Sequence, residues 1–213
     1  NLEIKSLTLD ELIQKNKTKK KLKYRIGYTP TINTKLKYAL IEDEQILGKS
    51  LIKTFNDLEI DVDHFKSADV FLESSQPSDY HLIITDKYLP GMDGVSLIRK
   101  IKKKFPLIPI ILISGFLDES SLLKASQLGI YTVIEKPFNS NLLIRQSYNA
   151  SLNYLNRVLL EKTHKIVSYS FGAISYDNKL SESEVESIQS EIQAITTEMI
   201  KIKKYFSTII DYK

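Results

Sequence analysis

Five polar residues of the sequence stand where short apolar segments end. They are the acidic pair Glu42 and Asp43, followed by Asp86, Ser114 and Lys136. Carboxylates crowded at one place repel one another and raise each other's pKa, so such a cluster is stable when a divalent cation neutralises it through oxygen ligands. A metal ion, a hydroxyl and an ammonium around one carboxylate are the groups that a transferred phosphoryl group requires. These residue types therefore indicate phosphoryl chemistry with Mg²⁺ as the cofactor.

These residues can meet only if the apolar segments are strands of one parallel sheet. The segments are short, rich in β-branched residues and mostly apolar on both faces, as buried parallel strands are. They cover residues 38–41, 60–65, 82–85, 108–114 and 131–135. Amphipathic helical stretches lie between them, at 45–56, 67–75, 94–105 and 118–128. This alternation predicts an α/β doubly wound sheet of five parallel strands, which binds ligands beyond the carboxyl ends of its strands.

The same residues resemble the receiver domain of two-component response regulators, over about Lys37 to Gln146. The acidic pair lies in IEDE at 41–44, the central aspartate opens DKYLPGMDG at 86–94, and the lysine lies in EKPF at 135–138. The resemblance implies a flavodoxin-like fold. It also implies that the protein receives phosphate from a cognate histidine kinase or a phosphotransfer protein.

The resemblance gives each site residue an implied role. Asp86 would attack phosphorus and become an acyl phosphate, and Ser114 and Lys136 would contact the phosphoryl oxygens. The implied ligands of Mg²⁺ are Asp86 itself, Asp43, the backbone carbonyl of Tyr88 and, through water, Glu42. An autophosphatase activity is compatible with such a site.

One position departs from the family pattern. Receiver domains usually carry Tyr or Phe three residues before the lysine, where the ring acts as a rotameric switch, and this sequence has Val133 there. We therefore expect phosphoryl chemistry to be retained and the usual aromatic read-out to be absent.

The last part of the chain, 147–213, has a purely helical pattern. Apolar residues with spacings of three and four form two stripes, which predicts two antiparallel helices in a hairpin. The first stripe is Leu152, Leu155, Leu159, Ile166, Tyr169, Ala173 and Tyr176. The second is Val185, Ile188, Ile192, Ile195, Met199, Ile202, Phe206 and Ile209. A capping box of Ser181 and Glu184 is expected to start the second helix, after a turn at 176–181.

Two helices with one apolar stripe each cannot bury both stripes by themselves. We therefore expect two hairpins to pair as a coiled-coil-like four-helix bundle, which makes the protein a homodimer. The segment THKIVSYSFGAI at 163–174 resembles the phosphoacceptor box of histidine-kinase dimerisation domains, with His164 as the phosphotransfer residue. Lys165 stands where those kinases usually place an acid, which favours a degenerate form.

Two interpretations of the hairpin stay open. The chain is either a phosphorelay module whose hairpin carries or has lost chemistry at His164, or a response regulator whose hairpin only dimerises and binds proteins. No glycine-rich ATP-binding segment follows the hairpin, so ATP-dependent kinase activity is not expected from this chain alone. The chain would then be a fragment of a hybrid kinase or a regulator with a dimerising output, and its start at Asn1 rather than Met suggests a piece of a longer protein.

Composition excludes several other classes of protein. The 213 residues are 42% hydrophobic and 26% charged, which suffices for a buried core. The absence of cysteine excludes disulfides and thiolate zinc sites, and three scattered histidines disfavour a histidine-based metal site. No apolar run approaches the roughly 20 residues of a membrane span, so we expect no membrane span and a soluble, cytoplasmic protein.

Residues 1–36 are expected to form a basic extension or linker. Seven cations lie within residues 15–25, and no acid occurs within 13–40. Such a run can attract nucleic acid, but a solvated linker is the commoner role and the whole chain carries a net charge of only +4. Nucleic-acid binding is therefore not expected. We divide the chain into this extension, a receiver-like domain at 37–146 and a helical hairpin at 147–213.

Overall fold

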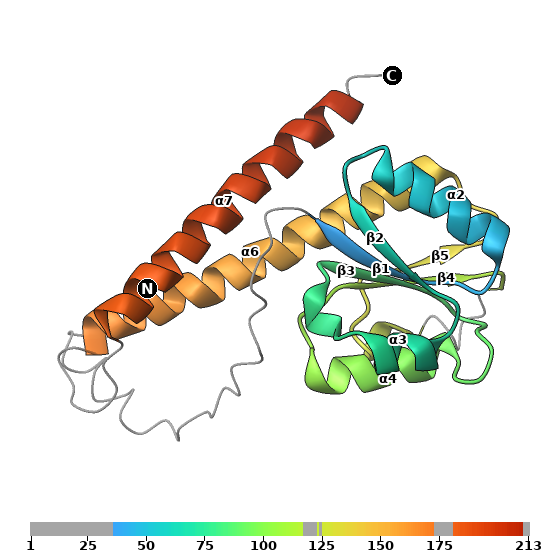
Figure 1. Ribbon diagram of the computed structural model, residues 1–213, viewed down its shortest axis with the longest axis horizontal. Coiled ribbons are helices and arrows are strands. Elements are labelled where there is room, and N and C mark those ends of the chain that lie inside the picture. The colour runs from blue at the N-terminus through green and yellow to red at the C-terminus, as the bar shows by residue number, and fades with distance from the viewer. Residues whose placement is uncertain (1–35, 117–122, 124, 173–180, 211–213) are drawn as a thin grey trace, which may run out of the picture.

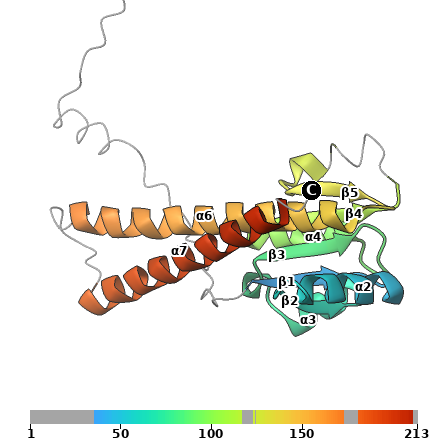
Figure 2. The same cartoon turned by 90° about the horizontal axis from the view of Figure 1, so that it is seen from above.

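The computed structural model describes residues 36–116, 123, 125–172 and 181–210. Almost all of the basic extension therefore lies outside the described residues, as do parts of the predicted helix at 118–128 and most of the predicted turn at 176–181. The described residues form a sheet with helices on both faces, and two long helices reach beyond it (Figure 1, Figure 2).

Five segments form one parallel sheet, in the spatial order β2-β1-β3-β4-β5. The strands are β1 (Lys37–Ile41), β2 (Asp61–Phe65), β3 (Leu82–Asp86), β4 (Ile110–Ser114) and β5 (Thr132–Glu135). The central strands β1, β3 and β4 are buried almost throughout, which explains why their sequences are apolar on both faces. The predicted doubly wound, flavodoxin-like fold is confirmed, and its strand order reverses between β1 and β3.

Helices α2 and α6 cover one face of the sheet, and α3 and α4 cover the other (Figure 1). The helical elements are α2 (Gln45–Asn56), α3 (Ala68–Ser74), the short 3₁₀ helix η1 (Pro77–Asp79), α4 (Gly94–Lys104), α6 (Ser140–Gly172) and α7 (Glu182–Ile210). The side chain of Asp93 caps α4 by accepting a hydrogen bond from the backbone N–H of Ser96 at 2.8 Å. This cap fixes the end of the loop that follows β3.

A polar anchor joins β1 to α6 within the apolar core. Tyr38 of β1 is fully buried, and its ring packs edge-on against Phe55 of α2 with the centroids 5.3 Å apart. Its hydroxyl accepts a hydrogen bond from Ser151 at 2.9 Å and donates one to the carbonyl of Ser147 at 3.5 Å, both on α6. Burial raises the pKa of Tyr38, so this hydroxyl stays protonated and keeps its role as a donor.

Helix α6 runs without a break through 33 residues, from the sheet into the hairpin. Helix α7 packs back along it in the opposite direction, and Met199 of α7 belongs to the same buried cluster as Leu155 and Val158 of α6 (Figure 2). The capping box at the start of α7 is confirmed. Ser181 Oγ accepts from the backbone N–H of Glu184 at 3.3 Å, and Glu184 Oε2 accepts from the backbone N–H of Ser181 at 2.7 Å. Within the part of the chain that the structure describes, no helix combines the length and apolarity needed to cross a membrane.

His81, just before β3, is a buried group whose titration should control stability. Its Nδ1 accepts a hydrogen bond from the backbone N–H of Lys37 at 3.1 Å, and burial lowers its pKa from 6.5 to about 4. Between pH 6.5 and about pH 4, His81 is protonated in the unfolded chain but not in the folded chain. The free energy of unfolding therefore decreases as the pH falls through this range. We expect the free energy of unfolding, measured by urea titration, to drop by about 2 kcal/mol between about pH 7.5 and about pH 5.

The matched control for this pH dependence is His81→Asn. Its side-chain oxygen keeps an acceptor near the Lys37 N–H but does not titrate in this range. The loss of stability on acidification should therefore be smaller than in the wild type by about 2 kcal/mol. Equal losses in both proteins would show that His81 is not the responding group.

Candidate functional site

The candidate site lies at the carboxyl ends of the strands, at the point where the strand order reverses. Glu42 and Asp43 follow β1, and Asp86 is the last residue of β3. One carboxylate oxygen of each of these acids lies within 4.8 Å of those of the other two. The structure therefore brings the three acids together, and their oxygens are the ligand type that a hard divalent cation prefers.

The side chain of Asp86 is buried and held from two sides. Its Oδ1 accepts a hydrogen bond from the backbone N–H of Tyr88 at 2.9 Å, and its Oδ2 accepts one from the ammonium of Lys136. Lys136 comes directly after β5, and its backbone N–H donates to the carbonyl of Ser114 at 2.7 Å. The ends of β3, β4 and β5 are thus connected through this one lysine.

The Lys136 ammonium bridges two carboxylates. Besides its contact with Asp86, it donates to Oε2 of Glu42 at 2.9 Å. Burial acts to lower the pKa of Lys136, but the hydrogen bonds and negative charges of Asp86 and Glu42 outweigh it and raise that pKa. Lys136 therefore remains a cation that offsets part of the negative charge of the acids.

Glu42 and Asp43 occupy different environments although they are neighbours in sequence. Glu42 is only 1% exposed, and its second oxygen, Oε1, accepts from the backbone N–H of Glu44 at 3.2 Å. Burial raises the pKa of Glu42, while the hydrogen bond from Lys136 partly counters this. Asp43 is exposed to solvent. Asp43 is therefore the more accessible ligand, and Glu42 is the one already held by the protein.

Ser114 ends β4, the strand next to β3, whose Asp86 pairs in register with Ile113. The Ser114 hydroxyl is buried and bonds to its own loop. It donates to the carbonyl of Phe116 at 2.7 Å and accepts from the Phe116 N–H at 3.2 Å. The structure thus places Ser114 at the predicted edge, with its hydroxyl turned to the backbone of the loop rather than to the acids.

A comparison with known families decides what this arrangement is. Residues 39–147, just over half of the chain, match the model of the response regulator receiver domain. The chain belongs to this family. The match ends at residue 147, near the predicted start of the hairpin. It therefore gives no support to the resemblance between the hairpin and histidine-kinase dimerisation domains.

Two relatives show how far the likeness reaches. Over 111 residues the chain is 34% identical to the C4-dicarboxylate transport transcriptional regulatory protein DctD of Rhizobium meliloti (strain 1021), which covers 52% of this chain and 24% of that protein. Over 112 residues it is 27% identical to the transcriptional regulatory protein FixJ of Bradyrhizobium diazoefficiens, which covers 53% of this chain and 55% of that protein. The chain thus spans about a quarter of the first relative and about half of the second.

Solved structures agree with this assignment. NtrX from Brucella abortus is 25% identical with a TM-score of 0.55, over 61% of this chain and 30% of that chain. The BeF3-activated DrrB receiver domain is 26% identical with a TM-score of 0.51, over 55% of this chain and 97% of that chain. Together with the family match, these likenesses identify the segment as the receiver domain of a two-component response regulator.

The receiver domain has no aromatic ring at the position of Val133, which is half-buried on β5. Tyr131 lies two residues earlier, directly before β5. Its ring packs against the core, and burial raises its pKa while the side chain of Asn153 on α6 partly counters this. The aromatic group near Val133 therefore belongs to the packed core beside α6.

His164 lies on α6 with its side chain exposed. Helix α6 begins at Ser140, at the same edge of the receiver domain as the acids, so a rise of 1.5 Å per residue places His164 about 36 Å farther along the helix. His164 is therefore not part of the receiver site within one chain, and phosphoryl transfer between the two would require a second molecule. Its predicted role in phosphotransfer stays a prediction.

Two residues that the sequence did not single out contact the backbone of the receiver site. His64 of β2 lies with its Nε2 2.8 Å from the carbonyl oxygen of Glu42. Gly94, at the start of α4, lies so close to Asp86 that a Cβ atom would be 2.0 Å from the Asp86 carbonyl oxygen. The Asp-Gly pair at 93–94 indicates only a turn, and nothing in the sequence around His64 indicates its contact.

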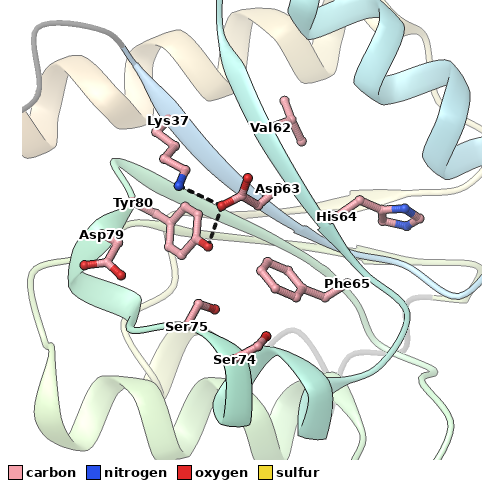
Figure 3. A pocket seen from close by; sticks show the side chains of 9 residues that line it. All are labelled: Lys37, Val62, Asp63, His64, Phe65, Ser74, Ser75, Asp79 and Tyr80. Atoms are coloured by element: carbon pink, nitrogen blue, oxygen red, sulfur yellow. Dashed lines mark hydrogen bonds and ion pairs between the residues drawn. The ribbon is translucent and has the colours of Figure 1, made fainter.

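A pocket of about 450 Å³ lies along β2, beside α3 and η1 (Figure 3). Its main polar groups already satisfy one another. Lys37 forms an ion pair with Asp63 at 2.7 Å, and the Tyr80 hydroxyl donates to the same carboxylate at 2.9 Å. Lys37 begins β1 and Tyr80 precedes β3, so this pair marks the amino ends of the strands, away from the acids. The pocket is therefore separate from the candidate site.

Proposed function

We propose that this receiver domain takes up a phosphoryl group on Asp86 in a Mg²⁺-dependent reaction. The observation that carries the proposal is the convergence of three carboxylates and one lysine from the ends of three strands, β1, β3 and β5. A carboxylate oxygen of Asp86 attacks phosphorus, an O–P bond forms, and the bond between phosphorus and the donor breaks with its electron pair leaving on the donor. The product is an acyl phosphate.

The acids of the site fit a magnesium ion. Asp43, Asp86 and the backbone carbonyl of Tyr88 would hold it directly, and Glu42 would act through water. When bound, the ion neutralises negative charge on the carboxylates and on the transferred phosphoryl group. The exposure of Asp43 and the pairing of buried Glu42 with Lys136 support this difference between a direct and an indirect role.

Lys136 and Ser114 would contact the phosphoryl oxygens. The Lys136 ammonium already lies against the oxygen of Asp86 that faces it, so it can follow the negative charge to a phosphoryl oxygen after attack. The Ser114 hydroxyl would have to exchange its bond to the Phe116 carbonyl for a phosphoryl oxygen. This exchange at Ser114 requires the backbone at Phe116 to move when Asp86 is phosphorylated.

Incubation with a small phosphodonor such as acetyl phosphate tests the function. The protein should gain hydroxylamine-labile phosphate in the presence of Mg²⁺ and not in the presence of a chelator. Mass spectrometry should locate the group on Asp86. Phosphate found on another residue, or uptake that the chelator does not change, would contradict the proposal.

The two neighbouring acids should differ in their effect on metal binding. Asp43→Ala removes a direct ligand, whereas Glu42→Gln changes a group that acts through water, so we expect the first to weaken Mg²⁺ binding at least about tenfold more than the second. Calorimetric titration would measure both. Glu44→Gln, an exposed acid of the same loop, is the matched control and should leave the affinity within about twofold. Equal losses for Asp43 and Glu42 would refute the difference in roles.

We propose a cognate histidine kinase or a phosphotransfer protein as the phosphoryl donor. DctD and FixJ are named as transcriptional regulatory proteins, but the chain spans only part of each. The names of these relatives therefore assign no output to this chain, and the hairpin at 147–213 is interpreted from its own residues. For that hairpin, as the second domain after the receiver domain at 37–146, we retain the proposal of a dimerisation module.

Exposed apolar residues on the hairpin support pairing with a second copy. Leu160 of α6 is 69% exposed and Ile200 of α7 is 62% exposed. We expect Leu160→Asp with Ile200→Asp to convert a dimer into a monomer in sedimentation experiments, because a bundle would bury both charges at a cost of several kcal/mol. The receiver domain should stay folded, since both side chains are exposed within one chain. Gln189→Asp, at an exposed polar position, should remain dimeric, and a monomeric wild type would refute the bundle.

A further inference from the structure

The structure assigns His64 a role in positioning the acidic pair of the receiver site, an inference that rests on the proposed function. His64 lies on β2, a strand that supplies none of the three acids. Its Nε2 is 2.8 Å from the backbone carbonyl oxygen of Glu42. A carbonyl oxygen can only accept a hydrogen bond, so Nε2 carries the proton and donates it.

The carbonyl that His64 holds belongs to the peptide unit between Glu42 and Asp43. Because this unit is planar, fixing its oxygen fixes the direction in which the backbone leads to Asp43. The N–H of Glu42 is held as well, since it donates to the carbonyl of Phe65 at 3.0 Å. Strand β2 therefore holds both backbone polar groups of Glu42 at the point where the chain leaves β1. Asp43, whose side chain would bind the ion, is the residue that directly follows this fixed peptide unit.

Gly48 provides the space that the imidazole occupies. It lies in the first turn of α2 and is buried, and a Cβ atom built on it would lie 2.7 Å from both Cε1 and Nε2 of His64. Helices favour alanine over glycine, so propensity does not explain this residue, whereas the room for the ring does. Figure 3 shows the ring of His64 directed away from the pocket and toward the α2 side of β2. Two elements thus cooperate to keep the donor on the Glu42 carbonyl.

The hydrogen bond of His64 goes to the backbone carbonyl of Glu42 and not to a carboxylate of the site. His64 would therefore act through the backbone, as a positioning residue. Without its bond, the peptide between Glu42 and Asp43 can reorient, and Asp43 loses part of its preorganisation for the ion. Loss of such a supporting contact typically weakens metal binding tenfold or more. We therefore expect His64→Ala to bind Mg²⁺ about tenfold more weakly than the wild type.

Side-chain substitutions at His64 separate positioning from a general structural role. His64→Gln places an amide N–H at a reach similar to that of Nε2 and should restore most of the affinity. His64→Asn carries the same amide on a shorter side chain and should behave like His64→Ala. Calorimetry would give the affinity for Mg²⁺, and thermal unfolding of the same samples would show whether the fold is kept. A purely structural role would make affinity follow stability rather than the reach of the donor.

A second perturbation approaches the same contact from α2. Gly48→Ala should displace the ring and so reproduce the roughly tenfold loss of Mg²⁺ affinity while His64 is still present. In the His64→Ala background there is no ring to displace, so Gly48→Ala should cause no further loss. The double-mutant cycle is therefore expected to be strongly non-additive.

Each outcome of this experiment decides something. A wild-type protein that binds no Mg²⁺ refutes the proposed metal site and this inference with it. A wild type that binds Mg²⁺, together with a folded His64→Ala that binds it equally well, refutes the role of His64 alone. Equal affinities for the Gln and Ala variants, or additive losses from Gly48→Ala and His64→Ala, would also overturn it.

Discussion

Asp86→Asn is expected to reduce Mg²⁺-dependent phosphate uptake to background. A neutral amide cannot serve as the attacking nucleophile, and it removes one of the three negative charges that would hold the ion. The structure predicts that the fold survives the change. The amide oxygen can still accept the N–H of Tyr88, and Lys136 keeps its second partner, Glu42. Incubation with acetyl phosphate, followed by an assay of hydroxylamine-labile phosphate, would measure the effect.

The loop after β3 offers a matched control for this variant. Asp93 lies seven residues later and caps α4 through its hydrogen bond from Ser96. Asparagine is about as good a capping residue as aspartate, so Asp93→Asn should leave both stability and phosphate uptake close to the wild type. If Asp86→Asn still gained acyl phosphate at the wild-type level, another carboxylate would be the acceptor.

Gly94→Ala should be the most destabilising single-methyl change near the site. The added Cβ would lie 2.0 Å from the carbonyl oxygen of Asp86 and 3.2 Å from Cα of Lys87, both of them backbone atoms that cannot swing aside. Either the end of β3 or the start of α4 must move, and overpacking of this kind costs about 3 kcal/mol. Gly94→Ala should thus destabilise the protein although helix propensity alone favours alanine over glycine. Urea unfolding would measure the loss.

The same substitution should also impair the site, because the displaced atoms belong to Asp86 itself. Phosphate uptake by the folded fraction of Gly94→Ala is expected to fall. Gly115→Ala is the control for stability, because a Cβ there meets no atom within 4 Å, and its free energy of unfolding should change by no more than about 0.5 kcal/mol. A Gly94→Ala protein as stable as the Gly115→Ala protein would contradict this prediction, because it would show that the backbone at Asp86 can move at little cost in free energy.

The sequence predicted the sheet and the acids of the site because both depend on rules that act locally. Buried parallel strands are apolar on both faces, and their carboxyl ends must share one edge. The predicted strand at 108–114 begins two residues later, at Ile110, since Pro109 has no N–H to donate to the neighbouring strand. Of the predicted helix at 118–128, the described residues 123 and 125–127 are helical.

The contacts that complete the site could not be predicted in this way. The bridge from Lys136 to Glu42 joins residues 94 positions apart, and the bond from His64 to Glu42 joins residues 22 positions apart. No local pattern encodes which side chain meets a given carbonyl after folding. The bond between the Ser114 hydroxyl and the Phe116 carbonyl is local, yet the sequence alone favoured a hydroxyl aimed at phosphate.

The unbroken helix α6 makes the receiver domain and the hairpin mechanically one piece. Its 33 residues amount to a rod of about 50 Å, held near its base by the bonds between Tyr38, Ser147 and Ser151. A tilt of about 5° at that base would move the far end sideways by about 4 Å, about three quarters of the 5.4 Å pitch of a helix. A small rearrangement at the sheet would thereby become a larger displacement of the far end of α6.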